Sequence, residues 1–484
     1  MNRRKLITGA AAIGAMATLN RKARALSSSQ INVLFDQNLQ PNVSPHPVPS
    51  GLVNIAPLGD SRTAIIAFDT LFLNQASSSH LNWMNAVSSW RYPYTGVFAL
   101  SGITSTTIVQ QYLDPALLTK PAAVTILMGI NDQPAGISIY QSVQNMLTAI
   151  KAIFNASATP IIFTDPGNTG FTTQQCALWH GAGGYNDQLR AIAANDPGIL
   201  LVDWISTVLA STNPIVWNTD PSGNPYSADG THFDVPGGCV AGAYADSIIS
   251  PYFGAPGAPF TGNNFVTNSA FAGTSGTLGT GNTGTLPTSW TGSRDNANCS
   301  AAFSINVRGD GATEVVMVMT TNNTVGVFAG VKITQTITSL NNLQVCSEIR
   351  ASMQADIDAA SVLTDVYVQF TATFNDASFQ QVYCFRSASA NKGPILTTNP
   401  NLLTLVSDPF TMPAGKFITS IAMVAGAQTT GTGISQTATV RFRNIALIPQ
   451  PPGQISGHIL YVDGVTEIQE AGNPANVLAY TRGP

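Results

Sequence analysis

Three residues of this 484-residue chain have side chains suited to nucleophilic chemistry. Ser61 follows an apolar run that predicts a strand, whereas Asp229 and His232 lie close together much later in the chain. A serine hydroxyl is a poor nucleophile until a nearby base takes its proton. A carboxylate can hold an imidazole base in one tautomer and stabilise its developing positive charge. We therefore predict Ser61 as the nucleophile, His232 as its base and Asp229 as the carboxylate that orients the base.

The same chemistry needs hydrogen-bond donors, because attack on a carbonyl carbon creates an oxyanion. The backbone N–H of Ser61, the backbone N–H of Gly102 and the side-chain amide of Asn131 are the candidates. Taken singly, each residue has a simpler interpretation as part of a turn or a helix cap, and the same holds for Asp229 and His232. Their joint occurrence is what favours a site.

Four short motifs occur in a fixed order along residues 51–254. They are Gly59-Asp60-Ser61, the glycine of Leu100-Ser101-Gly102, Gly129-Ile130-Asn131-Asp132 and Asp229-Gly230-Thr231-His232. Together they resemble the GDS, Gly, G-x-N-D and D-x-x-H blocks of the SGNH/GDSL hydrolases. The resemblance implies a serine esterase without a metal or organic cofactor, with Ser61, Gly102 and Asn131 as the oxyanion hole. The G-x-S-x-G elbow of α/β-hydrolases is absent around Ser61, which suits a shallower, more open site.

Other residues near the motifs have competing interpretations. Arg62 can interact with an anionic substrate group or face solvent, and we expect the solvent position. Four further histidines lack a carboxylate placed like Asp229 and are expected to be structural or exposed: His46, His80, His180 and His458, with His180 as the reserve base. Five tryptophans can stack on sugar rings but are expected in the core: Trp83, Trp90, Trp179, Trp204 and Trp217.

The region 51–254 alternates short apolar runs with helical patterns, which predicts an α/β domain of three layers around a parallel sheet. The expected strands are Val53–Leu58, Val97–Leu100, Ala123–Met128, Pro160–Thr164 and Ile199–Trp204. Residues 139–154 have apolar side chains spaced as one face of a helix. In such a sheet, ligands bind at the carboxyl ends of the strands, where the motifs fall.

Beyond a Pro- and Gly-rich linker at 255–262, the pattern changes to alternating apolar and polar residues. Strand-like runs occur at 315–319, 325–333, 366–370, 382–385, 418–424 and 440–442. They predict an antiparallel β-sandwich over residues 263–448. The segments Asn264–Phe271 and Leu286–Trp290 resemble the start of jelly-roll carbohydrate-binding modules. A second Pro-rich break precedes a tail, 449–484, that is expected to add a strand pair or remain mobile.

The N-terminus has the features of an export signal. A basic start is followed by a weakly apolar run and by Ala23-Arg24-Ala25, so residues 1–25 predict a signal peptide and 26–50 an extension. The Arg3-Arg4 pair resembles the twin-arginine signal, with an ordinary secretory signal as the alternative. We therefore expect a periplasmic or extracellular protein. No later stretch reaches about 18 uninterrupted apolar residues, so no stable membrane insertion is expected.

Composition and cysteine spacing narrow the classes further. Charged residues make up 10% of the chain and the net charge is −4, without a basic stripe, which argues against a nucleic-acid partner. The five cysteines form no C-x-x-C pair and have no histidines at metal spacing, so a metal site is not expected. In an oxidising compartment Cys176 can bridge to Cys239, and two of the other three can pair.

Export, an open site and a sugar-binding sandwich favour an esterase that deacetylates a polysaccharide or glycan. A lipolytic or aryl esterase is the alternative within the same family. It would use the same residues to hydrolyse a different ester substrate. A non-catalytic carbohydrate-binding or adhesion protein of the cell surface is the alternative from another class. A glycosidase is less favoured, because it needs two carboxylates flanking the sugar bond and only Asp60, Asp132 and Asp229 lie near the motifs. The sequence predicts no oligomeric state.

Overall fold

The computed structural model describes residues 53–65, 73–254, 264–321, 328–340, 348–358, 363–386, 395, 402–413, 415–430, 435–450, 459–462, 465–469 and 477–481. The predicted signal peptide and extension, the linker at 255–262, and His46, His458 and Cys346 lie outside these residues.

The first part of the chain is built around a five-stranded parallel sheet of order β3-β1-β4-β5-β6. Its strands are β1 (Ile55–Gly59), β3 (Phe98–Ala99), β4 (Ala123–Leu127), β5 (Thr159–Phe163) and β6 (Leu200–Val202). Each lies within one of the expected apolar runs or within a residue or two of it. The carboxyl ends of β1, β3 and β4 are therefore neighbours at one edge of the sheet.

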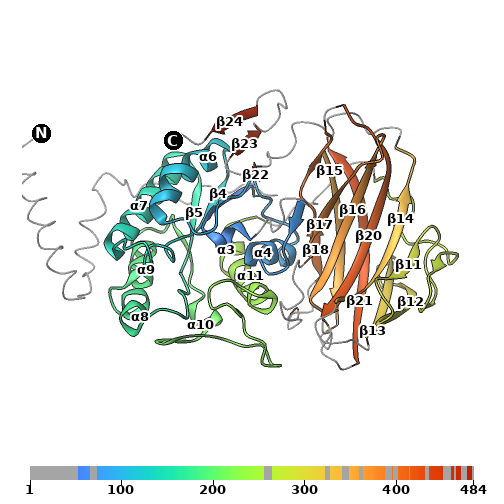
Figure 1. Cartoon of the computed structure of the whole chain (residues 1–484), viewed down its shortest axis with the longest axis horizontal. Coiled ribbons are helices and arrows are strands. Elements are labelled where there is room, and N and C mark those ends of the chain that lie inside the picture. Colours follow the sequence, from blue (N-terminus) through green and yellow to red (C-terminus); the bar gives the residue numbers. More distant parts are fainter. Residues whose placement is uncertain are drawn as a thin grey trace, which may run out of the picture.

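Helices cover both faces of this sheet, as Figure 1 shows. On one face, α7 (Ile139–Asn155) and α9 (Tyr185–Asn195) share a core with Leu58 and Ile126. On the other face, α4 (His80–Val87) and α11 (Val235–Ile249) share a core with Ile55 and Leu127. Neighbouring side chains of a strand point to opposite faces, so the sheet supplies both cores. The predicted three-layer α/β domain is confirmed.

Shorter elements connect these layers near the strand ends. They are α3 (Ser61–Ala64), α5 (Ser105–Thr107), the π-helix η2 (Ile108–Tyr112), α6 (Leu113–Leu118), α8 (Thr173–His180), α10 (Ile205–Val208) and the 3₁₀-helix η3 (Ser250–Tyr252). A small hairpin consists of β7 (Leu209–Thr212) and β8 (Ile215–Trp217).

The second part is a β-sandwich of two sheets whose strands are mainly antiparallel. One sheet has the order β10-β12-β13-β21-β15-β18, with β19 paired to β15, and the other has the order β2-β17-β16-β20-β14-β11-β9. The strands of these two sheets are β2 (Leu73–Gln75), β9 (Thr277–Leu278), β10 (Thr283–Gly284), β11 (Thr291–Arg294), β12 (Cys299–Val307), β13 (Thr313–Thr321), β14 (Phe328–Ile337), β15 (Glu348–Ile357), β16 (Asp365–Phe374), β17 (Phe379–Cys384), β18 (Leu403–Val406), β19 (Phe410–Thr411), β20 (Ile418–Thr430) and β21 (Gln436–Gln450).

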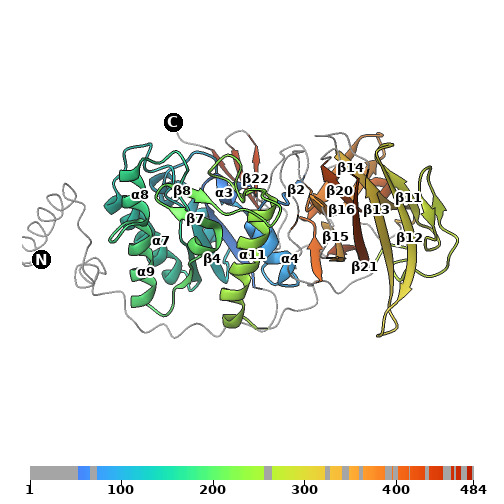
Figure 2. The ribbon, with the colours of Figure 1, turned by 90° about the horizontal axis from the view of Figure 1, so that it is seen from below.

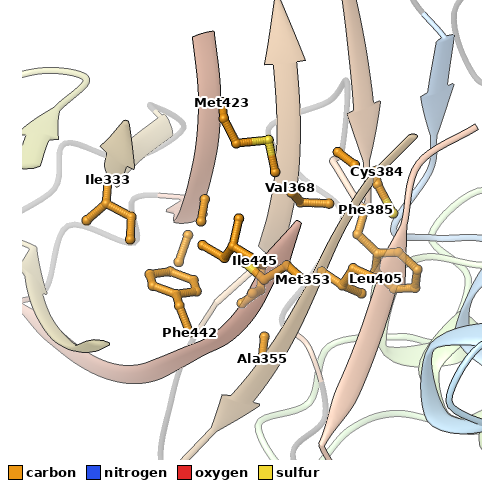
Figure 3. Packing of buried hydrophobic residues seen from close by; sticks show 14 of the residues in the cluster. Ile333, Met353, Ala355, Val368, Cys384, Phe385, Leu405, Met423, Phe442 and Ile445 are labelled. Carbon is orange, nitrogen blue, oxygen red and sulfur yellow. The ribbon is translucent and has the colours of Figure 1, made fainter. Parts of the chain in front are cut away.

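Apolar side chains from the two sheets meet between them to form the sandwich core. Figure 3 shows Val368 and Met423 from one sheet with Met353 and Phe442 from the other. All four are fully buried. The predicted β-sandwich is therefore confirmed. In the tail, β22 (Ile459–Val462), β23 (Val465–Gln469) and β24 (Val477–Thr481) form a three-stranded antiparallel sheet, one strand more than the expected pair.

The two parts share a sheet, a feature that the sequence patterns do not predict. The short strand β2 (Leu73–Gln75) follows the first motif in the chain, yet it pairs in parallel with β17 of the sandwich. Figure 2 shows β2 between α4 and the sandwich strands. Ser77 Oγ donates to Asp365 Oδ1 at 2.6 Å, and the ring of Trp83 lies edge-on to that of Phe385. The segment after Ser61 is thus anchored in the second domain.

Three further expectations can be checked against the fold. The five tryptophans are buried, with 0–5% exposure, as expected for core residues. The bridge that Cys176 and Cys239 could form is absent, because both are buried thiols and no disulfide joins them. Cys176 is buried on α8 and Cys239 is buried on α11, so each side chain packs against the neighbours of its own helix. Among the described residues, none of the helices has both the length and the apolar composition of a membrane span.

Candidate active site

Ser61 lies on a tight turn at the carboxyl end of β1. The strand ends at Gly59, and Asp60 caps α3 by accepting a hydrogen bond from the N–H of Arg62 at 3.0 Å. A Cβ atom on Gly59 would lie 2.2 Å from Thr63 Oγ1 and 2.5 Å from the carbonyl oxygen of Leu127. Only glycine lets the chain turn back so closely beside β4, so this residue sets where the Ser61 side chain emerges.

His232 and Asp229 complete a continuous chain of hydrogen bonds to Ser61. The Nε2 atom of His232 lies 2.7 Å from Ser61 Oγ, and its Nδ1 atom lies 2.8 Å from Asp229 Oδ2. The other carboxylate oxygen of Asp229 accepts from the backbone N–H groups of Thr231 and His232, both at 2.8 Å. Asp229 therefore fixes the turn as well as the imidazole ring.

The surroundings of Asp229 favour its ionised form. Partial burial raises the pKa of its carboxyl, but the hydrogen bonds from His232 and Thr231 outweigh that effect and lower the pKa to about 2. The Asp229 side chain is 55% exposed and that of His232 is 29% exposed. The carboxylate is thus negative at neutral pH, and solvent reaches this end of the site.

The three predicted oxyanion residues follow neighbouring strands. Ser61 follows β1, Gly102 follows β3 and Asn131 follows β4. Gly102 is exposed and has a φ of +78°, and a Cβ atom there would have no described residue within 4 Å other than its chain neighbours. Asn131 Nδ2 donates to the carbonyl oxygen of Ile103 at 2.9 Å. An amide group has two N–H bonds, so this contact orients Asn131 and uses one of them.

Asp132, the last residue of the third motif, has a structural role that sequence reasoning missed. It is fully buried and accepts from the backbone N–H of Ser105 at 2.8 Å, from Ser105 Oγ at 2.5 Å and from Ser142 Oγ at 2.6 Å. Burial raises the pKa of Asp132 despite these hydrogen bonds. This carboxyl ties the turn that carries Asn131 to the segment just after Gly102. In the sequence, only the position of Asp132 directly after Asn131 in the third motif could have indicated this role.

The expectation that Arg62 faces solvent is wrong. Arg62 is 1% exposed and lies between two carboxylates. Its guanidinium donates to Asp60 at 3.0 and 2.7 Å and to Asp165 at 2.6 and 2.8 Å. Burial alone would lower the pKa of Arg62, but the two carboxylates outweigh it and hold the pKa above its usual value. A buried guanidinium requires such partners, and Asp165 could not be recognised as one because it lies 103 positions away.

Neither of the other two described histidines, His80 and His180, forms a hydrogen bond with Ser61. His180, the reserve base, lies in α8, with Nε2 at 3.0 Å from the carbonyl oxygen of Pro166 and Nδ1 at 3.1 Å from Asn186 Nδ2. His80 is fully buried among the rings of Phe163, Trp204 and Phe233. Both are structural, as expected for histidines without an acidic partner placed like Asp229.

Comparison with known proteins supports the motif-based resemblance for the first domain. Residues 58–237 match the model of the GDSL-like lipase/acylhydrolase family. The comparison with curated proteins returned no match.

Several solved structures are similar to parts of the chain. The crystal structure of TesA is 22% identical, covers 41% of this chain and 99% of its own, and has a TM-score of 0.32. The psychrotrophic esterase EstA from Pseudoalteromonas sp., solved in an inhibited form, is 13% identical, with 41% and 97% coverage and a TM-score of 0.31. A structure of carbohydrate-binding modules from the β-sandwich superfamily is 12% identical, with 40% and 65% coverage and a TM-score of 0.26.

Proposed function

From the match of residues 58–237 to the GDSL-like lipase/acylhydrolase family, we infer that this chain is a serine esterase that hydrolyses its substrate through an acyl-enzyme. The observation that carries the proposal is the hydrogen-bonded chain from Ser61 Oγ through the imidazole of His232 to the carboxylate of Asp229. Nucleophile, base and orienting group stand at hydrogen-bond distances in the required order.

The first half of the reaction acylates Ser61. As Ser61 Oγ bonds to the ester carbonyl carbon, its proton passes to Nε2 of His232, and Asp229 stabilises the resulting imidazolium. The carbonyl oxygen becomes an oxyanion, for which the N–H groups of Ser61 and Gly102 and the Asn131 amide are the donors. The imidazolium then returns the proton to the leaving alcohol oxygen while the bond between that oxygen and the acyl carbon breaks.

The second half releases the acyl group. A water molecule gives one proton to His232 as its oxygen attacks the acyl carbon. The bond to Ser61 Oγ then breaks, and His232 returns the proton to that oxygen. The products are a carboxylic acid and the restored Ser61 hydroxyl. Both halves use the same base and the same donors, so the described residues suffice without a further acid.

The substrate class that we propose is an acetylated polysaccharide or glycan outside the cytoplasm. The side chains of Asp229 and His232 are partly exposed, which suits a substrate too large to enter a closed pocket. The signal-like pattern of residues 1–25 and the β-sandwich fit an exported protein that meets such polymers. A lipid or small aryl ester is the alternative substrate for the same chemistry.

Two assays test these proposals. The purified chain and its Ser61→Ala variant are compared on p-nitrophenyl acetate, where the proposal requires hydrolysis by the unmodified chain alone. Equal rates would exclude the esterase and favour a binding or adhesion protein. In the second assay, acetate release from acetylated glycan is compared with hydrolysis of long-chain esters. Faster hydrolysis of the long-chain esters would replace the glycan by a lipid substrate.

A further inference from the structure

The loop between β5 and α8, residues 164–172, contacts both halves of the site. At its start, Asp165 accepts two hydrogen bonds from Arg62, the residue next to Ser61. Further along, Asn168 Nδ2 donates to Thr231 Oγ1, and the N–H of Thr169 donates to the carbonyl oxygen of Gly230 at 3.1 Å. Thr231 and Gly230 immediately precede His232. One loop thus connects the turn of the nucleophile with the turn of the base.

The loop is held in one shape by its own hydrogen bonds. The N–H of Gly167 donates to Asp165 Oδ1 at 2.8 Å, and the N–H of Gly170 donates to Asn168 Oδ1 at 2.6 Å. From α9, the side chain of Asn186 accepts from the N–H of Asp165 at 2.7 Å and donates to its carbonyl oxygen at 2.8 Å. The distance between the two points of contact with the site is therefore constrained.

The turn of the base is shaped to fit this loop. Gly230 has a φ of +78°, and a Cβ atom there would lie 1.9 Å from Thr169 Oγ1. The backbone of the turn can approach Thr169 only because residue 230 has no side chain. Asn168 then meets the hydroxyl of the next residue, Thr231. These contacts act on the backbone directly before His232 and leave its imidazole available to Ser61.

We propose that the β5–α8 loop sets the distance between His232 and Ser61, with Asn168 as a positioning residue that acts through Thr231. The inference rests on the proposed esterase function. Proton transfer requires the two side chains to stay within hydrogen-bond reach, and a misplacement of about 1 Å can cost a factor of about 10² in rate. Asn168 does not touch the reacting atoms, so its loss should weaken the chemical step and leave substrate binding almost intact.

The test compares Asn168→Ala and Thr231→Val with the unmodified chain on p-nitrophenyl acetate. Each variant removes one side of the same contact, so each should lower kcat by about tenfold, within the range expected for a displaced base. KM and the midpoint of thermal unfolding should change little. Combining the two substitutions should add little to either alone, since both remove the same hydrogen bond. Thr231→Ser keeps the hydroxyl and should restore most of kcat.

A matched control is Asn195→Ala. This exposed asparagine donates to the carbonyl oxygen of Ala191 at 2.8 Å in α9 and should leave kcat unchanged when replaced. Unchanged kcat in Asn168→Ala and Thr231→Val, or a loss that follows a lowered unfolding midpoint, would overturn the positioning role. If Ser61→Ala, measured beside them, hydrolyses the ester as fast as the unmodified chain, the esterase function itself fails. Inactive Ser61→Ala together with fully active Asn168→Ala would overturn the positioning role alone.

Discussion

The Nε2 atom of His232 lies 2.7 Å from the Oγ atom of Ser61, although 171 positions separate the two residues in the chain. Helix packing explains how the fold brings them together. The turn of His232 leads into α11, which packs against α4, as Figure 2 shows. A Cβ on Gly238 would lie 2.3 Å from the carbonyl oxygen of Ser78, and one on Gly242 would lie 2.4 Å from that of His80. Because these two residues are glycines, α11 can lie close to the start of α4. This packing holds the turn of His232 near the ends of the strands.

Removal of the base should stop most turnover, and removal of its carboxylate should do less harm. His232→Ala deletes the proton acceptor. We expect kcat to fall by at least about 10²–10³, the factor by which the loss of a single oxyanion donor lowers kcat. Asp229→Asn should have a milder effect, because Asp229 orients the base without transferring the proton itself. Steady-state kinetics on p-nitrophenyl acetate measure both. A larger loss in Asp229→Asn than in His232→Ala would contradict these roles.

Asn131→Ala tests the oxyanion hole. If the amide stabilises the developing charge, kcat should fall by about 10²–10³, with little change in KM. The substitution also removes the hydrogen bond from Nδ2 to Ile103, so the unfolding midpoint is measured beside the kinetics. Normal turnover by a folded Asn131→Ala protein would mean that this amide does not contact the reacting carbonyl.

Arg62→Met should destabilise the folded protein strongly. It leaves Asp60 and Asp165 buried without their cation, and breaking such a buried pair costs about 3–5 kcal/mol. The control is Arg190→Met, because the side chains of Arg190 and Asp203 are each 36% exposed and such a pair contributes only about 0–1 kcal/mol. Urea unfolding gives both free energies. Similar losses in the two variants would show that the Arg62 pair is not buried in solution.

His80 should make stability depend on pH. Burial, aided by the charge of Arg62, lowers the pKa of His80 to about 3, and neither ring nitrogen has a hydrogen-bond partner among the described residues. The unfolded chain takes up a proton near the ordinary value of about 6.5, whereas the folded chain does not. The stability from neutral His80 is therefore complete above about pH 6.5 and decreases as the pH falls towards 3.

His80→Met should remove this dependence while filling much of the same space. Thermal unfolding of both proteins between pH 7 and pH 4 would measure it, since all other titrating groups are shared. The midpoint of the unmodified chain should fall more on acidification than that of His80→Met. Parallel curves would contradict a buried, neutral His80.

The sequence patterns predicted those parts of the fold that depend on local order. The strands of the parallel sheet, six strands of the sandwich and the helix at 139–155 follow from the spacing of apolar residues, whereas other sandwich strands, among them β12 and β15, were not predicted. The motifs that carry Ser61, Gly102 and Asn131 fall at strand ends because they follow those runs. Ser61 and His232 could be predicted as nucleophile and base because a serine nucleophile needs a nearby base and both residues lie in the recognised motifs. The sequence alone therefore predicts the α/β and β-sandwich classes.

The contacts that were missed join residues far apart in the chain. Nothing beside Arg62 indicates that Asp165 will neutralise it, and an arginine next to a site is exposed in most proteins. The strand β2 has three residues, too few to display a period, and its partner β17 lies some three hundred positions later. The separation of Cys176 and Cys239 likewise depends on how α8 and α11 are placed, which spacing alone does not specify.

Covalent labelling measures whether His232 activates the hydroxyl of Ser61. The intact protein is incubated with a fluorophosphonate ester at neutral pH, digested and analysed by mass spectrometry, with His232→Ala treated in parallel. We expect one phosphonyl group, located on Ser61, and almost no labelling of the variant. Labelling at another residue, or equally fast labelling of Ser61 without His232, would contradict it.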